Sequence, residues 1–483
     1  MREPTRRRWA RSQRTLFFLR SWRACLACLL FSTLLFPSRA VYGQQCPERA
    51  EEASVTRQLR AMSLDLRGQL PSAAELEEAL SLGEVPESWL DEWLASAAFA
   101  EVATRRHRSL LWNNLDNLNI YNNQAQLNRF RGEPPERNFV YWRNSVATGY
   151  RGARVPCLDQ AATFDRNGRP RVEEQSDGSF REGWVEVNPY WAPEQSIKVC
   201  AFDAQAALYS DDGERCASPQ GMRNPDCGCG PELRWCVVQE SRVRINRSLA
   251  ESLDRLIEEV FAEGLPYTAL FSQQRLFLDG PLTHFFLHHE NGRVELRPSP
   301  VDEALLTERP FNDTEWHPVN LSQAHAGILT HPAFLLRFQT NRARASRFYT
   351  SFLCSPFQPP VGGLPAGDDE SARDPDLQSR DGCKYCHALL EPAAAYWGRW
   401  TEQGIAYLDP ERFPQSREDC DLCARTGQGC SNECRRHYLT TALSQQETPF
   451  LGQLRAYTFR LPEHALNVEV GPRLLALGAI TDQ

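Results

Sequence analysis

The placement of the cysteines constrains this chain more than any other feature of its sequence. Sixteen cysteines occur in 483 residues, and two of them, Cys25 and Cys28, lie in an N-terminal segment that is basic and then apolar. Most of the other fourteen gather in two stretches, 157–236 and 383–434. Such clusters are typical of chains that are held by disulfides in an oxidising compartment. Whether the chain is exported is therefore the first question.

The N-terminal segment has the layout of a secretory signal peptide. Residues 1–23 are rich in arginine, 24–36 form a short apolar run, and small residues follow up to Gly43. The run is shorter than the stretch of about 20 apolar residues that spans a membrane, which makes an uncleaved anchor the weaker alternative. We predict a signal peptide over 1–43, a periplasmic or secreted protein, and no membrane span after leader removal.

The charge balance bears on the class of partner. Residues 1–43 carry nine arginines and one glutamate, a net charge of +8, so the remainder of a chain with a total of −8 carries −16. An acidic protein is poorly suited to bind nucleic acid or an anionic membrane surface. We therefore expect no nucleic-acid partner.

Helical signals dominate the N-terminal third of the chain. Ser72 followed by Glu75 forms a capping box that predicts a helix over the next residues. Apolar residues at helical spacing predict a second helix over 88–99 and a third over 102–115.

Helical order returns after an irregular, cysteine-rich stretch. Ser248 and Glu251 make a second capping box, and Gly264 predicts the end of that helix. Further helices are predicted over 331–338 and 342–354. Short strands are expected within the irregular stretch, at 181–187 and 235–240.

These patterns predict a mainly α protein. We expect a helical N-terminal domain, a Cys-rich irregular insertion, a helical central domain, a Pro/Gly-rich linker and a small helical C-terminal domain. Their predicted bounds are 44–150, 151–245, 246–354, 355–377 and 378–483.

One short motif carries specific chemistry. Cys383, Cys386 and His387 stand in the order C-x-x-C-H, directly after the predicted linker. This is the signature of covalent haem attachment, in which the two thiols bond to the vinyl groups and the histidine ligates the iron. Covalent haem attachment takes place outside the cytoplasm, and the predicted signal peptide would bring the chain there. The alternative is an ordinary C-x-x-C disulfide, or half of a metal site, beside an incidental histidine.

The sixth ligand of such an iron is harder to predict. No methionine follows His387, although methionine is a common sixth ligand. His437 is a candidate downstream, and His331 is a candidate upstream. An open or water-bound sixth position is the remaining possibility.

A second cysteine cluster follows the motif. Its four members have the spacing C-x2-C-x6-C-x3-C, which could hold a metal or two disulfides; they are Cys420, Cys423, Cys430 and Cys434. In an exported chain two disulfides are favoured, and the cysteines of the irregular insertion are interpreted in the same way. If one haem occupies Cys383 and Cys386, twelve cysteines remain for disulfides.

Several separated stretches together resemble a family of exported cytochrome c-like proteins of planctomycete and myxobacterial type. The resembling segments are 61–80, 270–287, 324–354 and 383–400, in that order. The resemblance covers about half of the chain and implies one covalent haem c at Cys383, Cys386 and His387. Glu391 and Pro392 stand where the family has Asp-Pro, and Ala393-Ala394 replaces Gly-Phe, so the packing beside the haem is expected to differ.

The sequence thus predicts extracytoplasmic electron transfer with an unknown redox partner protein. A haem enzyme of the peroxidase or oxidase kind, with an open sixth position, is the first alternative. A disulfide-stapled binding or structural protein without haem is the second.

Overall fold

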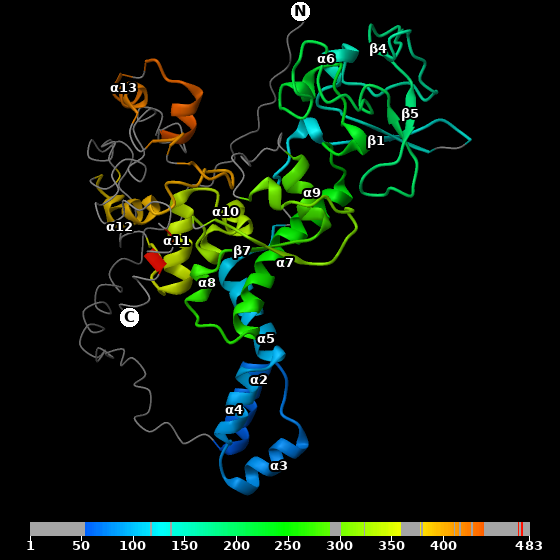
Figure 1. The fold of residues 1–483 in the computed structure, drawn as a ribbon. Helices are drawn as coiled ribbons and strands as arrows, with labels where there is room; N and C mark the ends of the chain where they lie inside the picture. Colours follow the sequence, from blue (N-terminus) through cyan, green and yellow to red (C-terminus); the bar gives the residue numbers. More distant parts are fainter. Residues whose placement is uncertain are drawn as a thin grey trace, which may run out of the picture. The chain divides into compact units, whose positions relative to one another are not determined.

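The fold is described from a computed structural model (Figure 1). It describes residues 54–438, apart from short gaps and two longer ones at 290–300 and 359–376. Beyond residue 438 it describes only residues 472, 475 and 476. The predicted signal peptide and most of the predicted linker therefore lie outside the described residues.

The structure divides into two units. Among the described residues, the smaller unit contains 54–60 and 73–85, and the larger contains 61–72 and everything from Pro86 onward. The smaller unit holds the first part of α2 (Val55–Arg67) and the whole of α3 (Ala73–Leu82). The position of α3 confirms the helix that the capping box at Ser72 predicted.

The larger unit is built on the long helix α7 (Gln239–Ala262), beside which α5 (Ala97–Leu111) and α9 (Gly280–His288) lie (Figure 1). Buried side chains recur along one face of α7 at the helical period: Ile245, Leu249, Leu253, Leu256, Ile257 and Val260. The remaining elements of this core are α4 (Glu87–Leu94), α8 (Ala269–Ser272), α10 (Pro332–Arg337), α11 (Asn341–Phe352), α12 (Lys384–Ala395), and a pair of antiparallel strands, β7 (Arg275–Leu278) and β8 (His317–Asn320). One hydrophobic cluster runs through these elements except α4, and it extends from Leu111 past Trp400 to Ile405 and Ala476.

A sheet-containing module is inserted between α5 and α7. Its main sheet has the order β1-β2-β6-β5, in which β2 and β6 are parallel and the other pairs antiparallel. The elements are β1 (Asn128–Arg131), β2 (Phe139–Trp142), α6 (Ala147–Arg151), β3 (Glu173–Glu174), β4 (Phe180–Arg181), β5 (Trp184–Val187) and β6 (Ile197–Cys200). The sheet therefore combines β1 and β2, which precede residue 150 in the chain, with β5 and β6, which follow it.

The first and last segments of the module are hydrogen-bonded to each other next to the helical core. The backbone N–H of Leu127 donates to the Val237 carbonyl at 2.9 Å, and the Val237 N–H donates to the Ala125 carbonyl at 2.8 Å. The chain therefore enters and leaves the module through two adjacent backbone segments.

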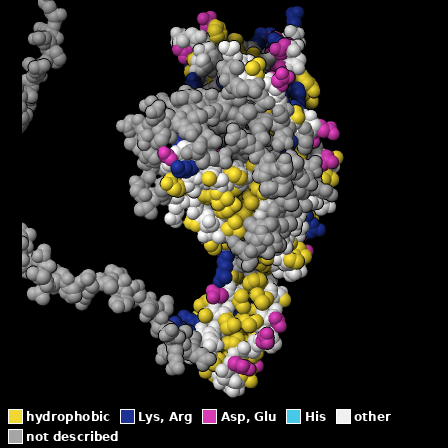
Figure 2. Space-filling view, turned by 90° about the vertical axis from the view of Figure 1, so that its left-hand side faces the viewer, with side chains coloured by type: hydrophobic (Ala, Val, Ile, Leu, Met, Phe, Trp, Pro, Cys, Tyr) yellow, Lys and Arg dark blue, Asp and Glu magenta, His cyan; other side chains and the backbone are white. Residues whose placement is uncertain are grey.

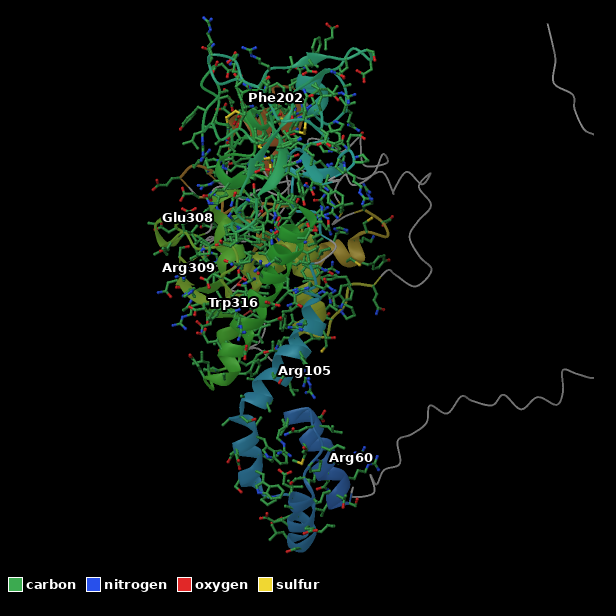
Figure 3. The ribbon with its side chains drawn as sticks, turned by 90° about the vertical axis from the view of Figure 1, so that its right-hand side faces the viewer. Arg60, Arg105, Phe202, Glu308, Arg309 and Trp316 are labelled. Atoms are coloured by element: carbon green, nitrogen blue, oxygen red, sulfur yellow. A yellow bond between two sulfur atoms is a disulfide. The ribbon has the colours of Figure 1, made fainter. Side chains whose placement is uncertain are left out.

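Three disulfides hold the module: Cys157–Cys200, Cys216–Cys227 and Cys229–Cys236. Figure 3 shows sulfur atoms in the region of the labelled Phe202. A buried ionic group fills part of its interior, where Asp203 accepts from Arg143 at 2.8 Å and from Arg151 at 3.0 Å. Both arginines and Asp203 are fully buried, so in this module disulfides and paired charges accompany a small apolar core.

The described residues are rich in helix and contain some sheet, which agrees with the predicted mainly α class at that level. Three helices were predicted with wrong bounds. The helix predicted over 102–115 is α5, which spans Ala97–Leu111. The helix predicted over 88–99 ends at Leu94, and α5 starts anew after Ser96, whose hydroxyl accepts from the Phe99 N–H at 3.2 Å. Ser248 does not cap α7, because α7 already begins at Gln239.

One of the two strand predictions was confirmed. β5 (Trp184–Val187) lies within the predicted stretch 181–187. At 235–240 the chain forms an isolated bridge through Val237 and then enters α7, so the strand predicted there was wrong. Among the described residues, no helix is both long enough and apolar enough to cross a bilayer.

Candidate haem site

Helix α12 arranges the C-x-x-C-H motif. Cys383 is its N-terminal flanking residue, and Cys386 and His387 lie in its first turn. The turn before the helix places Gly382 at φ +77°, a conformation that favours glycine. Residues three and four apart share a face of a helix, so the Cys383 position, Cys386 and His387 lie on one side of α12.

Neither motif cysteine forms a disulfide. Cys383 and Cys386 are partly buried free thiols, and the Cys386 thiol lies 3.3 Å from the Gln358 carbonyl oxygen. The second C-x-x-C pair behaves differently, because Cys420 bonds to Cys434 and Cys423 bonds to Cys430. These two bonds confirm the disulfides predicted for that cluster.

A carboxylate holds the histidine of the motif. Nδ1 of His387 lies 2.6 Å from Oε1 of Glu391, one helical turn further along α12. The same oxygen accepts from Nε of Arg342 on α11 at 2.7 Å. The side chain of Glu391 is 3% exposed, whereas that of His387 is 21% exposed. With Nδ1 donating to the carboxylate, Nε2 carries the lone pair that a metal ligand needs.

The back of α12 is fixed to the main core. Ala393, Ala394 and Ala395 are buried there, and Nε1 of Trp397 donates to the Leu329 carbonyl at 2.9 Å. Small residues at these positions allow α12 to pack closely against the core. This packing and the bond from Trp397 hold the helix that carries the motif.

A fully buried arginine fastens the chain that follows α12. Nη2 of Arg344 on α11 donates to the carbonyl oxygens of Thr401 at 2.9 Å and Gly404 at 3.2 Å. It also donates to Leu335 at 3.3 Å. These bonds connect α10, α11 and the segment after α12 in one network.

Two exposed side chains near the N-terminal end of α12 are largely apolar. Tyr385 and Leu389, one turn apart, are 66% and 47% exposed. Figure 2 shows the side of the molecule that lies on the left in Figure 1, and hydrophobic side chains reach the surface there. An apolar surface beside two free thiols and a partly exposed imidazole is a donor set and environment that fit a covalent haem.

His331, one predicted sixth ligand, has a structural role in the described fold. Its Nδ1 accepts from the Ala333 N–H at 3.1 Å and caps α10, and its Nε2 lies 3.1 Å from the Ser252 hydroxyl. Burial, and secondarily the nearby His325, lower its pKa to about 3. His331 is therefore a neutral histidine with both ring nitrogens engaged.

His437, the other predicted sixth ligand, lies in the turn Cys434–Tyr438. It is buried, and its ring centroid is 5.3 Å from that of Phe413. Phe413 and Tyr438 belong to a small hydrophobic cluster separate from the main core that backs α12. In the part of the chain that the structure describes, no group of three or more potential metal ligands contains His387, His331 or His437.

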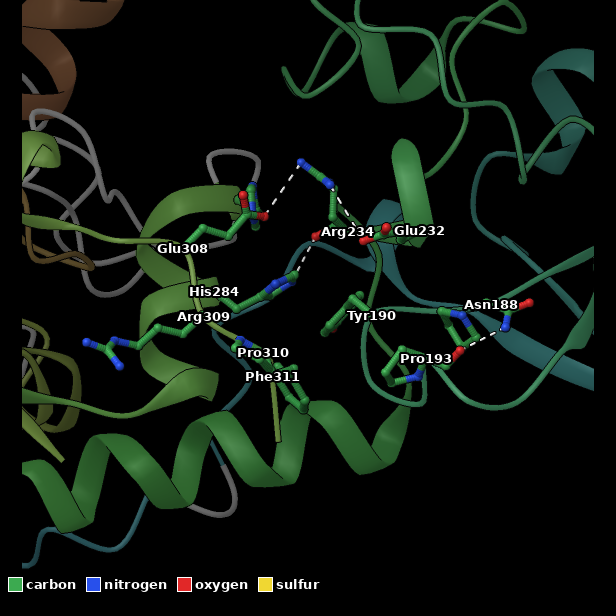
Figure 4. Close-up of a pocket in the computed structure, with 12 residues that line it drawn as sticks. Asn188, Tyr190, Pro193, Glu232, Arg234, His284, Glu308, Arg309, Pro310 and Phe311 are labelled. Atoms are coloured by element: carbon green, nitrogen blue, oxygen red, sulfur yellow. Dashed lines mark hydrogen bonds and ion pairs between the residues drawn. The ribbon is translucent and has the colours of Figure 1, made fainter. Parts of the chain in front are cut away.

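A cavity lies where the module meets the helical core (Figure 4). Its volume is about 560 Å³. His284 stacks on Tyr190 with ring centroids 3.8 Å apart and bonds to the Arg234 carbonyl at 3.1 Å. Burial places the pKa of His284 well below its usual value, so the ring is neutral. Arg234 lies 3.6 Å from Glu232 and 3.9 Å from Glu308, so the charges that line this cavity largely neutralise one another.

Three side-chain groups among the described residues have the spacing of a metal site. Two of them contain disulfide-bonded cysteines, which cannot ligate a metal as thiolates. The third is Asp313, Glu315 and His317, where Arg309 lies 3.4 Å from the Asp313 carboxylate and Glu315 is 83% exposed. Its ionic partner and its exposure make it an ordinary surface cluster.

No family model, no curated protein and no solved structure matches this chain. The assignment of the site therefore depends on its own geometry. Sequence reasoning singled out Cys383, Cys386 and His387 but missed Glu391 as the partner of the histidine and Arg342 as the partner of Glu391. Glu391 follows His387 by four residues, a spacing that places two side chains on one face of a helix, whereas Arg342 comes close only through tertiary packing.

Proposed function

We propose that this protein is an exported c-type cytochrome-like protein that binds one covalent haem and transfers electrons outside the cytoplasm. The observation that carries the proposal is the orientation of His387: Glu391 engages Nδ1 at 2.6 Å, which leaves Nε2 available on the face of α12 that also bears two unpaired thiols. This is the arrangement that a proximal haem ligand needs.

Each residue of the site has a defined task in this proposal. Cys383 and Cys386 provide the thiols for the two thioether bonds, and His387 provides the axial nitrogen. A bound haem would supply a one-electron ferric–ferrous couple. Glu391 and Arg342 hold the imidazole, and the packing of Trp397 keeps α12 in place. A support that moves little favours rapid outer-sphere transfer, because little reorganisation accompanies the change of charge.

The chemistry of the rest of the chain supports a location outside the cytoplasm. Five disulfides are formed among the described residues, which is typical of an oxidising compartment. These bonds support a periplasmic or secreted location, and the net charge of −16 after the predicted leader disfavours nucleic acid as a partner. The redox partner protein that electron transfer requires is part of the proposal.

A haem enzyme is the second candidate, and one observation favours it. A carboxylate on Nδ1 increases the basicity of the axial nitrogen, a feature that suits oxygen or peroxide chemistry at an open sixth position. His331, with both nitrogens engaged, leaves such a position more accessible than the sequence suggested. A binding protein without haem is the third candidate.

The deciding experiment is a pyridine haemochrome spectrum of protein produced in a host that matures cytochromes c. The protein is first denatured and extracted with acidified acetone, which removes haem that is not covalently attached. A retained c-type band with about one haem per chain supports the proposal. Cys386→Ser should change the band, because one thioether is lost, whereas the matched variant of an unpaired cysteine outside the motif, Cys354→Ser, should not.

The outcomes separate the three candidates. No retained haem eliminates both the carrier and the enzyme and leaves the binding protein. With haem retained, a low-spin spectrum favours the electron carrier, and a high-spin spectrum favours the enzyme. Loss of the low-spin spectrum in His437→Ala would identify His437 as the sixth ligand.

A further inference from the structure

Glu391 makes an unusual set of contacts for a buried carboxylate. Its Oε1 atom accepts from both Nδ1 of His387 and Nε of Arg342, at 2.6 and 2.7 Å. Its Oε2 atom is buried and has no hydrogen-bond partner. Both polar contacts of the side chain therefore converge on one oxygen, and one of the two points to the histidine of the motif.

The negative charge of Glu391 at Nδ1 affects Nε2, the nitrogen of the His387 ring that would ligate the iron. A carboxylate that accepts the Nδ1 proton increases electron density on the ring and makes Nε2 a stronger donor. The low dielectric around a 3% exposed carboxylate strengthens the effect. A stronger axial donor stabilises ferric iron more than ferrous iron, so it lowers the reduction potential.

Arg342 limits this effect without removing it. Its guanidinium shares Oε1 with His387, so it neutralises part of the carboxylate charge and fixes the carboxylate plane. It reaches the site from α11, whereas His387 and Glu391 both belong to α12. The two helices thus control the orientation of the histidine together.

We propose that Glu391 is a positioning residue that orients His387 through Nδ1 and holds the reduction potential of the haem low. This inference depends on the proposed function, because it concerns the haem that His387 would ligate. It deepens that function by naming the group that regulates the potential. A purely structural role, as one half of the Arg342–Glu391 ion pair between two helices, is the competing explanation.

The test compares three variants of the full-length, haem-loaded protein. Glu391→Gln removes the charge with little change of shape. Glu391→Asp keeps the charge but withdraws it by one methylene. Asp381→Asn is the matched control: it also removes one negative charge beside the motif, from an exposed residue that pairs with Lys384 at 2.6 Å. Each variant is measured by spectroelectrochemical titration and, where the ferrous haem is five-coordinate, by the iron–histidine stretching band in its resonance Raman spectrum.

Glu391→Gln should favour reduction at least tenfold, which corresponds to a rise of about 59 mV for a one-electron couple. Its iron–histidine band should move to lower frequency. Glu391→Asp should lie between the wild type and Glu391→Gln in both measurements, and Asp381→Asn should match the wild type. A structural role alone would lower the melting temperature of Glu391→Gln without moving either quantity.

The possible failures are distinct. If haem is retained and the Glu391 variants keep the potential and Raman band of Asp381→Asn, this inference is overturned and the proposed function stands. If Glu391→Gln does not mature, Glu391→Asp decides alone, and unchanged values in it overturn the inference. If the wild type holds no covalent haem, the proposed function fails, and the inference fails with it.

Discussion

Arg344 donates from Nη2 to the carbonyl oxygen of Thr401 at 2.9 Å, although its side chain is completely buried. The two residues lie 57 positions apart in the sequence, on opposite sides of the C-x-x-C-H motif. A charged side chain in such a place is stabilised by the several carbonyl dipoles around it rather than by solvent. The helix before the motif and the chain after it are therefore linked by one guanidinium group.

Replacing Arg344 should therefore destabilise the larger unit. Arg344→Met leaves the carbonyls of Thr401 and Gly404 without these donors, and we expect a loss of about 3 kcal/mol or more in the free energy of unfolding. Urea denaturation followed by circular dichroism measures it. Arg255→Met, at a surface pair with Glu258, is the control and should cost less than about 0.5 kcal/mol. Equal effects of the two variants would contradict the assigned role.

His331 should make the stability of the protein depend on pH. Burial lowers its pKa in the folded state to about 3, from an ordinary value of 6.5, so the unfolded chain takes up a proton first as the pH falls. Its contribution is complete above about pH 6.5 and decreases by about 1.4 kcal/mol per pH unit as the pH falls from there towards 3.

The variant His331→Asn isolates this contribution, because asparagine can still cap α10 but does not titrate. The free energy of unfolding, measured at pH 7.5 and 5.0, should fall less in the variant than in the wild type. The other buried histidines remain in both proteins and cancel in the comparison. The same pH dependence in both proteins would show that His331 does not titrate in this way.

Asp203 should be essential to the disulfide-held module. Burial opposes its ionisation, but Arg151 and Arg143 outweigh this and keep its pKa below the ordinary value. Asp203→Asn leaves the buried Arg143 without a counter-charge, whereas Arg151 keeps its pair with Glu182, and we expect a loss of about 3–5 kcal/mol. Unfolding monitored with the disulfides intact measures it, and Asp211→Asn at an exposed pair with Arg169 is the control.

Cys354 should react as a free thiol. Twelve cysteines outside the leader and the motif could form disulfides by sequence; the structure pairs ten of them and leaves Cys354 exposed and unbonded, while Cys46 lies outside the described residues. Iodoacetamide should label Cys354 in the native protein and should not label Cys423, which is bonded to Cys430. Peptide mapping without reduction reads both, and a peptide that joins Cys354 to another cysteine would contradict the prediction.

Local sequence signals predicted the fold where the structure itself is local. The capping box at Ser72 located α3, because a cap and the first turn after it lie within a few residues. The similar signal at Ser248 failed, since tertiary packing extends α7 back to Gln239 and directs the Ser248 hydroxyl to Asp279 instead. Helix propensity is a weak prior that long-range packing can override.

The site shows the same division between local and long-range information. Cys383, Cys386 and His387 are recognisable because their spacing alone sets their mutual geometry on one helix. The contact of Glu391 with Arg342 depends on the packing of α11 against α12, and the sequence contains no signal for that pair. The parallel pairing of β2 with β6 was likewise beyond prediction, because parallel strands are separated by a long crossover.

The paired segments at Leu127 and Val237 have a consequence for how this protein could have been assembled. Because the chain leaves the helical core and returns to it at neighbouring points, the backbone crosses between core and module at one place. Tyr190 of the module also belongs to the main hydrophobic cluster, where it stacks on His284. An insertion of this kind could be added to the core with one change in the path of the chain, but a core without it would have to fill the place of Tyr190 in another way.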